Sequence, residues 1–464
     1  MRRSVALSGL VAVLVIAAGC SRSSSSKPTN TTSAAAPAST SSTAPNPCAN
    51  VTLQATDVGI TPTTINVQVM ADVGSPLAPG LFQGNFDAMN AFATYVNAHG
   101  GIACRQLKVT TWDTKLDASE SLNGLINGCS NAFALVGNNV LFNNDLSPMD
   151  KCVDKTGAAT GLPNISALSA DLNEQCDPNT FTVQAVSANC PLKTGVATWT
   201  NQVGHVKYWL QQNPGLHGIF LVPGDLPTTV QASTYGIASQ QAAGITFDAT
   251  PKVSGTDAQP AYTPRVQIAK QKGSTYVFDG SNDVAMIRMR KEANAQGLTT
   301  VKVWGCSLSC YTQDFIPQGG SDVEGTYVWL GFLPFEEASY NAADQAYVTA
   351  LGSKVTSWGA QAWQAGMAFQ QAVNSIVATS GPNAVTRAAL LTALKGMTHF
   401  TADGWIGAKA LQGPGVFSPC FVLMQVQNGK FVRAYPTKPG TLDCNPSNLN
   451  TVNLDPVAEA AKIK

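Results

Sequence analysis

Apolar residues first follow a period of two near residue 65. Ile65, Val67 and Val69 alternate with other side chains, which is the pattern of a β-strand with one buried face. The run ends in a segment rich in Gly, Ser and Pro, residues 72–84. A strand followed by a loop is therefore predicted here.

The next segments complete one βαβ unit. Apolar residues then recur at steps of four and three between Phe82 and Val96, which predicts a helix with one apolar face. Gly100-Gly101 ends this helix. Alternation returns in residues 107–111, so the unit reads strand, crossover helix, strand, which requires parallel strands. Open sheets of this kind place ligands at the carboxyl ends of their strands. Loop 72–84, with Ser75 and Leu77, is expected to line a binding site. The helical stripe consists of Phe82, Phe86, Met89, Ala93 and Val96.

Two further strands end in polar residues. A strand at 133–136 leads into Gly137-Asn138-Asn139, with Phe142 close behind, and a strand at 164–168 leads to Ser169. Asn and Ser are common in turns, so each residue alone has an ordinary loop interpretation. Their shared position at strand ends favours a site that includes Asn138, Asn139, Ser166 and Ser169.

The alternation of helices and strands continues into a second series. Its segment after the strand at 275–278 is Asp279-Gly280-Ser281-Asn282. Asp279 and Ser281 are each candidates for capping the helix that starts near residue 284, because Asp and Ser are preferred N-caps, and Asp279 is also a candidate ligand group. The predicted helices are 195–212, 229–243, 263–272, 284–296, 360–379 and 386–395; the strands are 218–222, 245–249, 275–278, 301–304 and 327–330, with a hairpin at 421–432 turning at Asn428-Gly429.

Length and charge restrict the class of protein. A chain of 464 residues exceeds the size at which one core usually keeps growing, so two lobes are expected. Lys plus Arg and Asp plus Glu balance at 28 each, and charged residues make up 12%. Without a basic surface for phosphates, nucleic-acid binding is not expected.

The amino terminus has the pattern of an export signal. Met1-Arg2-Arg3 precedes an apolar run, residues 5–18, which is shorter than the ~20 residues that span a bilayer. Ala17-Ala18-Gly19-Cys20 is similar to a bacterial lipobox, in which the cysteine is lipidated. An ordinary cleaved signal with an incidental cysteine is the alternative.

A polar tether is predicted after Cys20. Residues 21–47 are almost only Ser, Thr, Ala, Pro and Asn, which cannot bury a core. As a flexible coil the segment would span roughly 30 Å. We therefore expect an exported chain, held by lipid at the outer face of the cell membrane.

Ten cysteines remain of eleven once Cys20 is set aside. An even number in an exported chain indicates disulfides. Zinc is the competing hypothesis, but Cys306 and Cys310 have no nearby His or second cysteine pair, so no metal is expected. Plausible local pairs are Cys104 with Cys129, Cys306 with Cys310 and Cys420 with Cys444, leaving Cys48, Cys152, Cys176 and Cys190.

From about residue 59 to 435 the chain resembles the type I periplasmic solute-binding proteins, specifically the branched-chain amino-acid binding family of ABC importers. The resemblance rests on the order and spacing of several pieces, none of which is diagnostic alone. These are GITPTTINVQVMADVGSPLAPG, YVNAHGGIACRQLKV, FALVG, GLPNIS, TYVFDGSNDVAMIRMRKEANAQGL, EGTYVWLGF and FVLMQVQNGKFV.

The resemblance implies an α/β fold of two doubly wound lobes with parallel-sheet cores, joined by three hinge crossings near residues 182–187, 327–332 and 413–416. A ligand would lie between the lobes and closure about the hinge would trap it, a transition for which periplasmic binding proteins are a standard example. The implied organisation is a signal peptide at 1–20, a tether at 21–50, lobe 1 at 59–184 plus 334–412, lobe 2 at 185–330 plus 416–440, and a tail at 441–464.

The resemblance also implies where a ligand would be held. Amino-acid-binding relatives hold the ligand carboxylate with hydroxyl groups and backbone amides of lobe 1, and its ammonium with an acidic residue of lobe 2. This sequence has Gly137-Asn138-Asn139 in place of the Ser/Thr run, and Ser307 near the acidic position, so a neutral or less polar solute is as compatible as an amino acid. The expected ligand-binding residues are Ser75, Leu77, Asn138, Asn139, Phe142, Ser166, Ser169, Asp279, Ser281, Asn282 and Ser307.

Other classes have less support. An exported hydrolase lacks a Gly-x-Ser-x-Gly elbow and a His-Glu-x-x-His pair in this sequence. A membrane-tethered ligand sensor needs the same closing cleft as a transport receptor, so both remain open. The prediction is a monomeric, cofactor-free receptor without catalytic residues that delivers a small molecule to an ABC permease.

Overall fold

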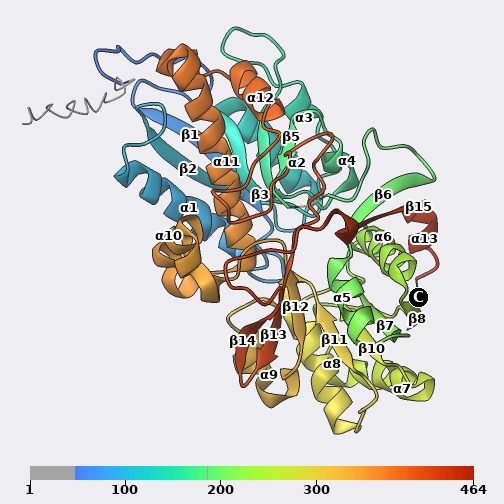
Figure 1. Ribbon diagram of the computed structural model, residues 1–464. Coiled ribbons are helices and arrows are strands. Elements are labelled where there is room, and N and C mark those ends of the chain that lie inside the picture. The colour runs from blue at the N-terminus through green and yellow to red at the C-terminus, as the bar shows by residue number, and fades with distance from the viewer. Residues whose placement is uncertain (1–47, 185, 464) are drawn as a thin grey trace, which may run out of the picture. The chain divides into compact units, whose positions relative to one another are not determined.

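The computed structural model describes residues 48–184 and 186–463 of the chain. The predicted signal, Cys20 and nearly all of the tether lie outside the described residues. Among those described, no helix is long and apolar enough to cross a membrane. Figure 1 shows helices packed beside two main sheets. The helices are α1 (Gln83–Ala98), α2 (Ala118–Asn131), α3 (Ser147–Asp150), α4 (Leu172–Gln175), α5 (Gly204–Gln212), α6 (Pro227–Ala243), α7 (Thr263–Lys272), α8 (Asp283–Ala295), α9 (Phe315–Gly319), α10 (Ala342–Leu351), α11 (Ser357–Ser380), α12 (Arg387–Lys395) and α13 (Pro456–Ala460).

The first sheet has five strands in the order β2-β1-β3-β4-β5, all parallel. Its central strands are buried on both faces, as expected for a parallel sheet covered by helices. Helix α1 follows β1, and the later helix α11 packs on β3 and β4. The strands are β1 (Thr64–Ala71), β2 (Gln106–Asp113), β3 (Ala134–Asn139), β4 (Asn164–Leu168) and β5 (Thr180–Thr182).

The second sheet has eight strands along the path β14-β13-β12-β11-β10-β7-β8, with β9 beside β7. Its strands from β7 to β12 pair in parallel, whereas β13 and β14 are antiparallel. The strands are β7 (His217–Pro223), β8 (Thr246–Ala249), β9 (Lys252–Val253), β10 (Tyr276–Asp279), β11 (Val303–Cys306), β12 (Tyr327–Leu330), β13 (Val422–Gln427) and β14 (Lys430–Tyr435).

Both sheets use the same doubly wound order. The order β2-β1-β3-β4-β5 of the first sheet recurs as β8-β7-β10-β11-β12 in the second. The chain passes between the sheets three times, through residues 183–196, 331–341 and 396–421, which we call the first, second and third crossing segments. The predicted α/β fold with parallel-sheet cores is confirmed.

The predicted helix at 195–212 is wrong in its first half. Residues there form β6 (Ala197–Gln202), which is followed by α5. The apolar residues Val196, Trp199, Val203 and Val206 recur at helical spacing, which produced the error. The strand forms because β15 (Leu449–Leu454) pairs with it antiparallel, placing Trp199 opposite Val452. A partner so distant in sequence leaves no local signal, and residues 441–464 therefore contain structure rather than only a tail.

Five disulfides join the ten cysteines of the described chain. Cys306 bonds Cys310 and Cys420 bonds Cys444. The expected pair of Cys104 with Cys129 is wrong, because Cys104 lies in the turn before the edge strand β2, whereas the end of α2 packs against α3. The observed partners are Cys48–Cys104, Cys129–Cys152 and Cys176–Cys190.

A buried arginine secures the region around Cys129. Arg387, at the start of α12, is fully buried and donates hydrogen bonds to the carbonyl oxygens of Cys129 (2.8 Å), Ala132 (2.6 Å) and Val153 (2.7 Å). Its main-chain nitrogen donates to the Asp57 carboxylate at 2.7 Å. One side chain thus joins α12 to the end of α2 and to the loop after α3 by charge-assisted hydrogen bonds.

Replacing this side chain tests its structural role. Arg387→Met should lower the free energy of unfolding by about 3 kcal/mol or more, because several buried carbonyls lose their donor. Urea unfolding of the purified chain measures the change. Lys395→Met, an exposed residue in the last turn of the same helix, is the matched control and should cost under about 0.5 kcal/mol. Equal losses in both variants would contradict the role given to Arg387.

Candidate functional site

The doubly wound order creates one switch point in each sheet, where ligands of such folds bind. The switch points lie between β1 and β3 and between β7 and β10. Asn139 is the last residue of β3, and Asp279 is the last residue of β10. These two side chains occupy equivalent positions, and both have no exposed surface.

A bulge in β3 precedes Asn139. Gly137 has φ +79°, and a β-carbon there would lie 2.8 Å from Met89 Sδ, so this position requires glycine. The register with β4 shifts on both sides of Asn138, which is how bulges redirect side chains near sites. Neither Oδ1 nor Nδ2 of Asn139 has a hydrogen-bond partner. Buried polar atoms without partners are rare and need an explanation.

Asp279 has a comparable deficit in the second sheet. Its carboxylate accepts a hydrogen bond from the Ser281 main-chain nitrogen (2.7 Å) through Oδ1, whereas Oδ2 has no partner. Burial raises the pKa of Asp279 to about 8, and the charge of Asp283 adds to the shift. The buried Tyr262 hydroxyl is also unpartnered, and burial, together with the charge of Asp279, raises the Tyr262 pKa.

Loops of the two sheets contact one another directly. Thr228 Oγ1, at the start of α6, donates to the Leu141 carbonyl at 3.0 Å. Ser357 Oγ, at the start of α11, donates to the Leu308 carbonyl at 3.1 Å. Gly255 lies so close to the Leu77 carbonyl that an added β-carbon would approach it to 2.8 Å. The described chain therefore has the two sheets' loops in contact.

Two expected ligand residues are used within the first sheet. Asn138 Oδ1 accepts from the Met70 main chain at 2.7 Å, and Nδ2 donates to Asn164 at 3.1 Å. Ser166 Oγ donates to the Leu168 carbonyl at 2.8 Å. These side chains make hydrogen bonds within the sheet beside the bulge. Their role in the structure without ligand is therefore to hold the strands together.

Other expected residues form caps and turns. Asn282 Oδ1 caps α8 by accepting from Ala285 (2.9 Å), so neither Asp279 nor Ser281 is the N-cap that the sequence suggested. Ser307 caps the short 3-10 helix η2 (Leu308–Cys310), and Ser75 accepts from the Leu77 nitrogen at 3.3 Å. The remaining expected residues are Ser169, buried with an unpartnered hydroxyl, half-buried Phe142 and Ser281, and exposed Leu77.

Three further buried polar side chains are not among the individually predicted ligand residues, although Asp72 begins the predicted loop 72–84. Asp72, fully buried after β1, accepts from Thr114 Oγ1 (2.6 Å) and from the Leu141 nitrogen (2.8 Å) and so positions the loop after β3. Gln361 of α11 donates to Gln184 at 2.6 Å and keeps Oε1 unpartnered. Tyr262 is the third. The position of Asp72 directly after a predicted strand was a usable signal.

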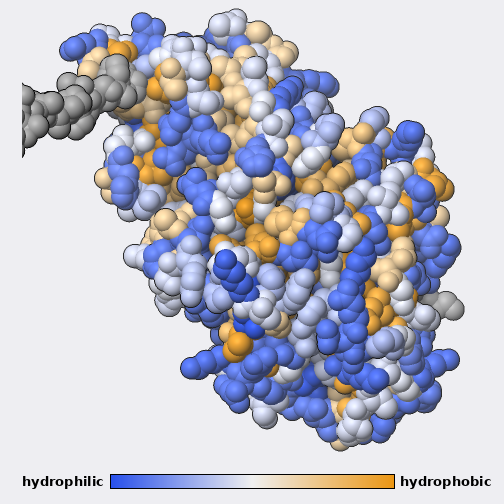
Figure 2. All heavy atoms as spheres, in the orientation of Figure 1, coloured by the Kyte–Doolittle hydropathy of each residue, from blue (hydrophilic) through white to orange (hydrophobic). Residues whose placement is uncertain are grey.

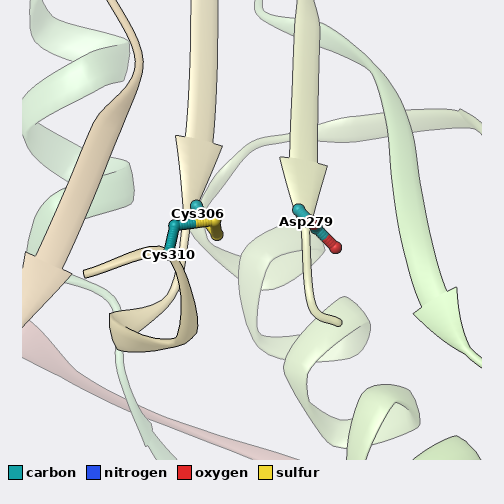
Figure 3. Close-up of side chains that lie close together, drawn as sticks. All are labelled: Asp279, Cys306 and Cys310. Carbon is teal, nitrogen blue, oxygen red and sulfur yellow. A yellow bond between two sulfur atoms is a disulfide. The ribbon is translucent and has the colours of Figure 1, made fainter. Parts of the chain in front are cut away.

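One group of residues has metal-ligand types but not metal chemistry. The possible ligand atoms of Asp279, Cys306 and Cys310 lie within 4.8 Å of one another. Figure 3 shows Asp279 and Cys306 at the ends of the adjacent strands β10 and β11, with Cys310 beside Cys306. Cys306 and Cys310 are bonded to each other, whereas metals bind cysteine as the free thiolate. This group therefore does not fit a metal ion.

Comparison with known families identifies the class of protein. Residues 64–430 match the model of the periplasmic binding protein family, so the chain belongs to this family of binding proteins. The resemblance to type I periplasmic solute-binding proteins is thereby confirmed. A comparison with curated proteins finds no match.

Solved structures with the same fold come from several organisms. An ABC transporter substrate-binding protein from Aeropyrum pernix has 11% identity and a TM-score of 0.64, covering 87% of this chain and 100% of its own. A leucine-binding protein from Thermotoga maritima has 12% identity and a TM-score of 0.60, covering 83% and 99%. A fatty acid ABC transporter substrate-binding protein from Thermomonospora curvata has 15% identity and a TM-score of 0.58, covering 83% and 97%. At these identities the likeness shows the fold alone.

The shifted pKa of Asp279 gives a test of its environment. Between its ordinary value of 3.8 and about 8, the folded chain holds a proton that the unfolded chain has lost, so the free energy of unfolding falls as pH rises through this range. Asn cannot ionise. The free energy of unfolding of Asp279→Asn, minus that of the wild type, should therefore rise by about 1 kcal/mol or more between pH 4.5 and pH 8. Above pH 8 this difference should level off.

Urea unfolding at pH 4.5, 6, 8 and 9 measures this trend. Asp314→Asn, at an exposed position, is the control and should follow the wild type at every pH. A difference between Asp279→Asn and the wild type that does not change with pH would show that the Asp279 carboxyl is not held in its protonated form.

Proposed function

We propose that the chain is the solute receptor of an ABC importer and traps a small organic molecule between two lobes that close about a hinge. Lobe 1 would comprise residues 59–184 and 334–412, and lobe 2 residues 185–330 and 416–440. Membership of a binding-protein family supports a receptor rather than an enzyme.

The observation that carries the proposal is the pair of equivalent polar groups at the switch points. Asn139 and Asp279 end the third strand of their respective doubly wound arrays, are fully buried and have unpartnered atoms. A bound solute that supplies these hydrogen bonds would remove a desolvation cost of about 1–3 kcal/mol for each group. The direct contacts of Leu141 with Thr228 and of Ser357 with Leu308 fit a closed form.

The available groups define the chemistry of the solute. Asn139 offers one donor group and one acceptor, and the hydroxyls of Ser169 and Tyr262 offer either. Asp279 would accept from an ammonium, which favours its ionised form by charge pairing, or from a neutral donor when the carboxyl is protonated. We infer a small, polar, amino-acid-like molecule. Leucine and fatty acid, which appear in the names of structural neighbours, are reference compounds for a screen.

Membrane attachment is the second part of the proposal. The lipobox-like Ala17-Ala18-Gly19-Cys20 and the polar segment 21–47 support a lipid anchor and a tether that leave the binding domain free to reach a permease.

The solute site is tested by a thermal-shift screen with the variant Asn139→Leu. Amino acids, amides, small aromatics and fatty acids are tested on the wild type; a ligand at ~100 times its Kd adds about 2.7 kcal/mol to the free energy of unfolding. Asn139→Leu should raise the Kd of that ligand at least tenfold. Because Leu removes unpartnered polar atoms, the variant without ligand should be as stable as the wild type.

A higher Kd with unchanged stability would show that Asn139 binds the ligand and is not needed for folding. Asn90→Leu, at an exposed position of α1, is the matched control and should keep the wild-type Kd. The proposed site is wrong if Asn139→Leu binds the ligand as the wild type does, or if it unfolds more easily without ligand. Turnover of a screened compound by the purified chain would instead indicate an enzyme.

The anchor is tested by Cys20→Ala. The variant should move from the membrane fraction to the soluble extracellular or periplasmic fraction, because a lipidated cysteine supplies the attachment. Cell fractionation followed by immunoblotting measures this, and Ser23→Ala, in the same segment of the sequence, controls for a substitution there. Undiminished membrane retention of Cys20→Ala would refute lipid anchoring at this residue.

A further inference from the structure

A small pocket lies where the three crossing segments meet. It contains about 30 Å³ of space, enough for one or two atoms the size of a water molecule and too little for an amino acid or a fatty acid. Its lining includes neither Asn139 nor Asp279, the two groups proposed to hold the solute. Its lining includes Val183 and Gln184 of the first crossing segment, Gly331 and Phe332 of the second, and Ile406, Gly407, Lys409, Ser418 and Cys420 of the third.

Lys409 is the only ionisable side chain among the residues that line this pocket. Its side chain is buried, with 4% of its surface exposed, and its Nζ donates one hydrogen bond, to the Val183 carbonyl at 2.9 Å. None of the ion pairs among the described residues includes it. Burial lowers the pKa of Lys409 to about 7. A buried ammonium without a counter-charge is costly, and two of its three N–H groups remain available.

The other unpartnered polar atoms around the pocket are also donors. Gln364 Nε2 of α11, Trp329 Nε1 of β12 and Gln202 Nε2 at the end of β6 have no partner. Gln202 Oε1 is paired with His205 Nδ1 at 2.9 Å, which leaves Nε2 as the unpartnered atom of this amide. Four side chains from different elements therefore bring unused N–H groups to one small space.

We infer that this pocket binds one small monovalent anion of halide size. An anion accepts hydrogen bonds from all sides and supplies the missing counter-charge for Lys409. A water molecule would satisfy two of the donors but would need acceptors for its own two hydrogens, and it would leave the ammonium uncompensated.

The anion would join parts of the chain that are distant in sequence. Lys409 belongs to the third crossing segment and donates a hydrogen bond to Val183 of the first. Trp329 of β12 lies just before the second crossing segment, and Gln364 belongs to α11, which packs on the first sheet. An ion held by these groups stabilises one arrangement of the crossing segments. The concentration of a common salt anion would then change the stability of the hinge without contacting the solute.

Bromide tests this inference because it is halide-sized and can be located by anomalous scattering. Crystals of the purified chain soaked in sodium bromide should show an anomalous peak within hydrogen-bond distance of Lys409 Nζ and Gln364. In solution at constant ionic strength, replacing gluconate, which is too large for the pocket, by bromide should raise the Tm with a saturable midpoint.

Two variants identify the donors. Lys409→Met should remove the peak and raise the bromide midpoint at least tenfold. Gln364→Glu keeps the side-chain shape and places a carboxylate beside the ammonium, so it should fold, lose the peak and lose the bromide dependence of Tm. Lys395→Met, at an exposed position, should behave as the wild type.

The possible outcomes are decisive. A wild-type pocket that holds water only, or a bromide response that is the same in Gln364→Glu as in the wild type, would overturn the inference. The result is independent of the solute proposal, because that proposal is read from solute binding by Asn139→Leu and this one from bromide at Lys409.

Discussion

A polar group that leaves water must find a partner inside the protein or in a ligand, and this constraint governs the ends of β3 and β10. The parallel strands hydrogen-bond one another along their lengths, so the requirement is met there by the backbone. At the switch points the connections that follow two neighbouring parallel strands lead to opposite sides, and Asn139 and Asp279 are left buried with unpartnered atoms. The same feature that builds the doubly wound sheet thus leaves hydrogen-bonding capacity for a guest molecule.

Burial shifts the pKa values of an acidic group, Asp279, and a basic group, Lys409, in opposite directions. Burial raises the pKa of Asp279 to about 8 and lowers that of Lys409 to about 7. Between these values both groups are mostly uncharged in the chain without ligands, because the interior disfavours the charged form of each. A cationic group bound at Asp279 would favour the ionised carboxylate, and an anion bound at Lys409 would favour the charged ammonium. Each ligand would therefore bind together with the loss or gain of a proton by its side chain.

The sequence predicted the first sheet well because its signals are local. Alternating residues around Ile65, the stripe of helix α1 and Gly137 at the end of a strand are all read within a short window. The errors have long-range causes. β6 was taken for a helix because its partner β15 lies about 250 residues away, and Cys104 bonds Cys48 across 56 residues. For the candidate site, the sequence predicted that Asn139 and Asp279 follow or end strands, and the structure places them there. It could not show that Asn138 accepts a hydrogen bond from the Met70 main chain or that Tyr262 lies near Asp279.

The position of α11 and α12 in the chain has a consequence for biogenesis. Helix α12, made late in the chain, supplies Arg387, which reaches back 254 residues to the Phe133 carbonyl, and α11 covers β3 and β4 (Figure 1). Figure 2 shows a largely hydrophilic face on the completed molecule. Helix α1 packs on β1, β2 and β3, but the cover that α11 gives to β3 and β4 is absent until the ribosome has added α11. Domains generally fold from the amino terminus during translation; here β3 and β4 receive their α11 cover only after most of the polypeptide has been made.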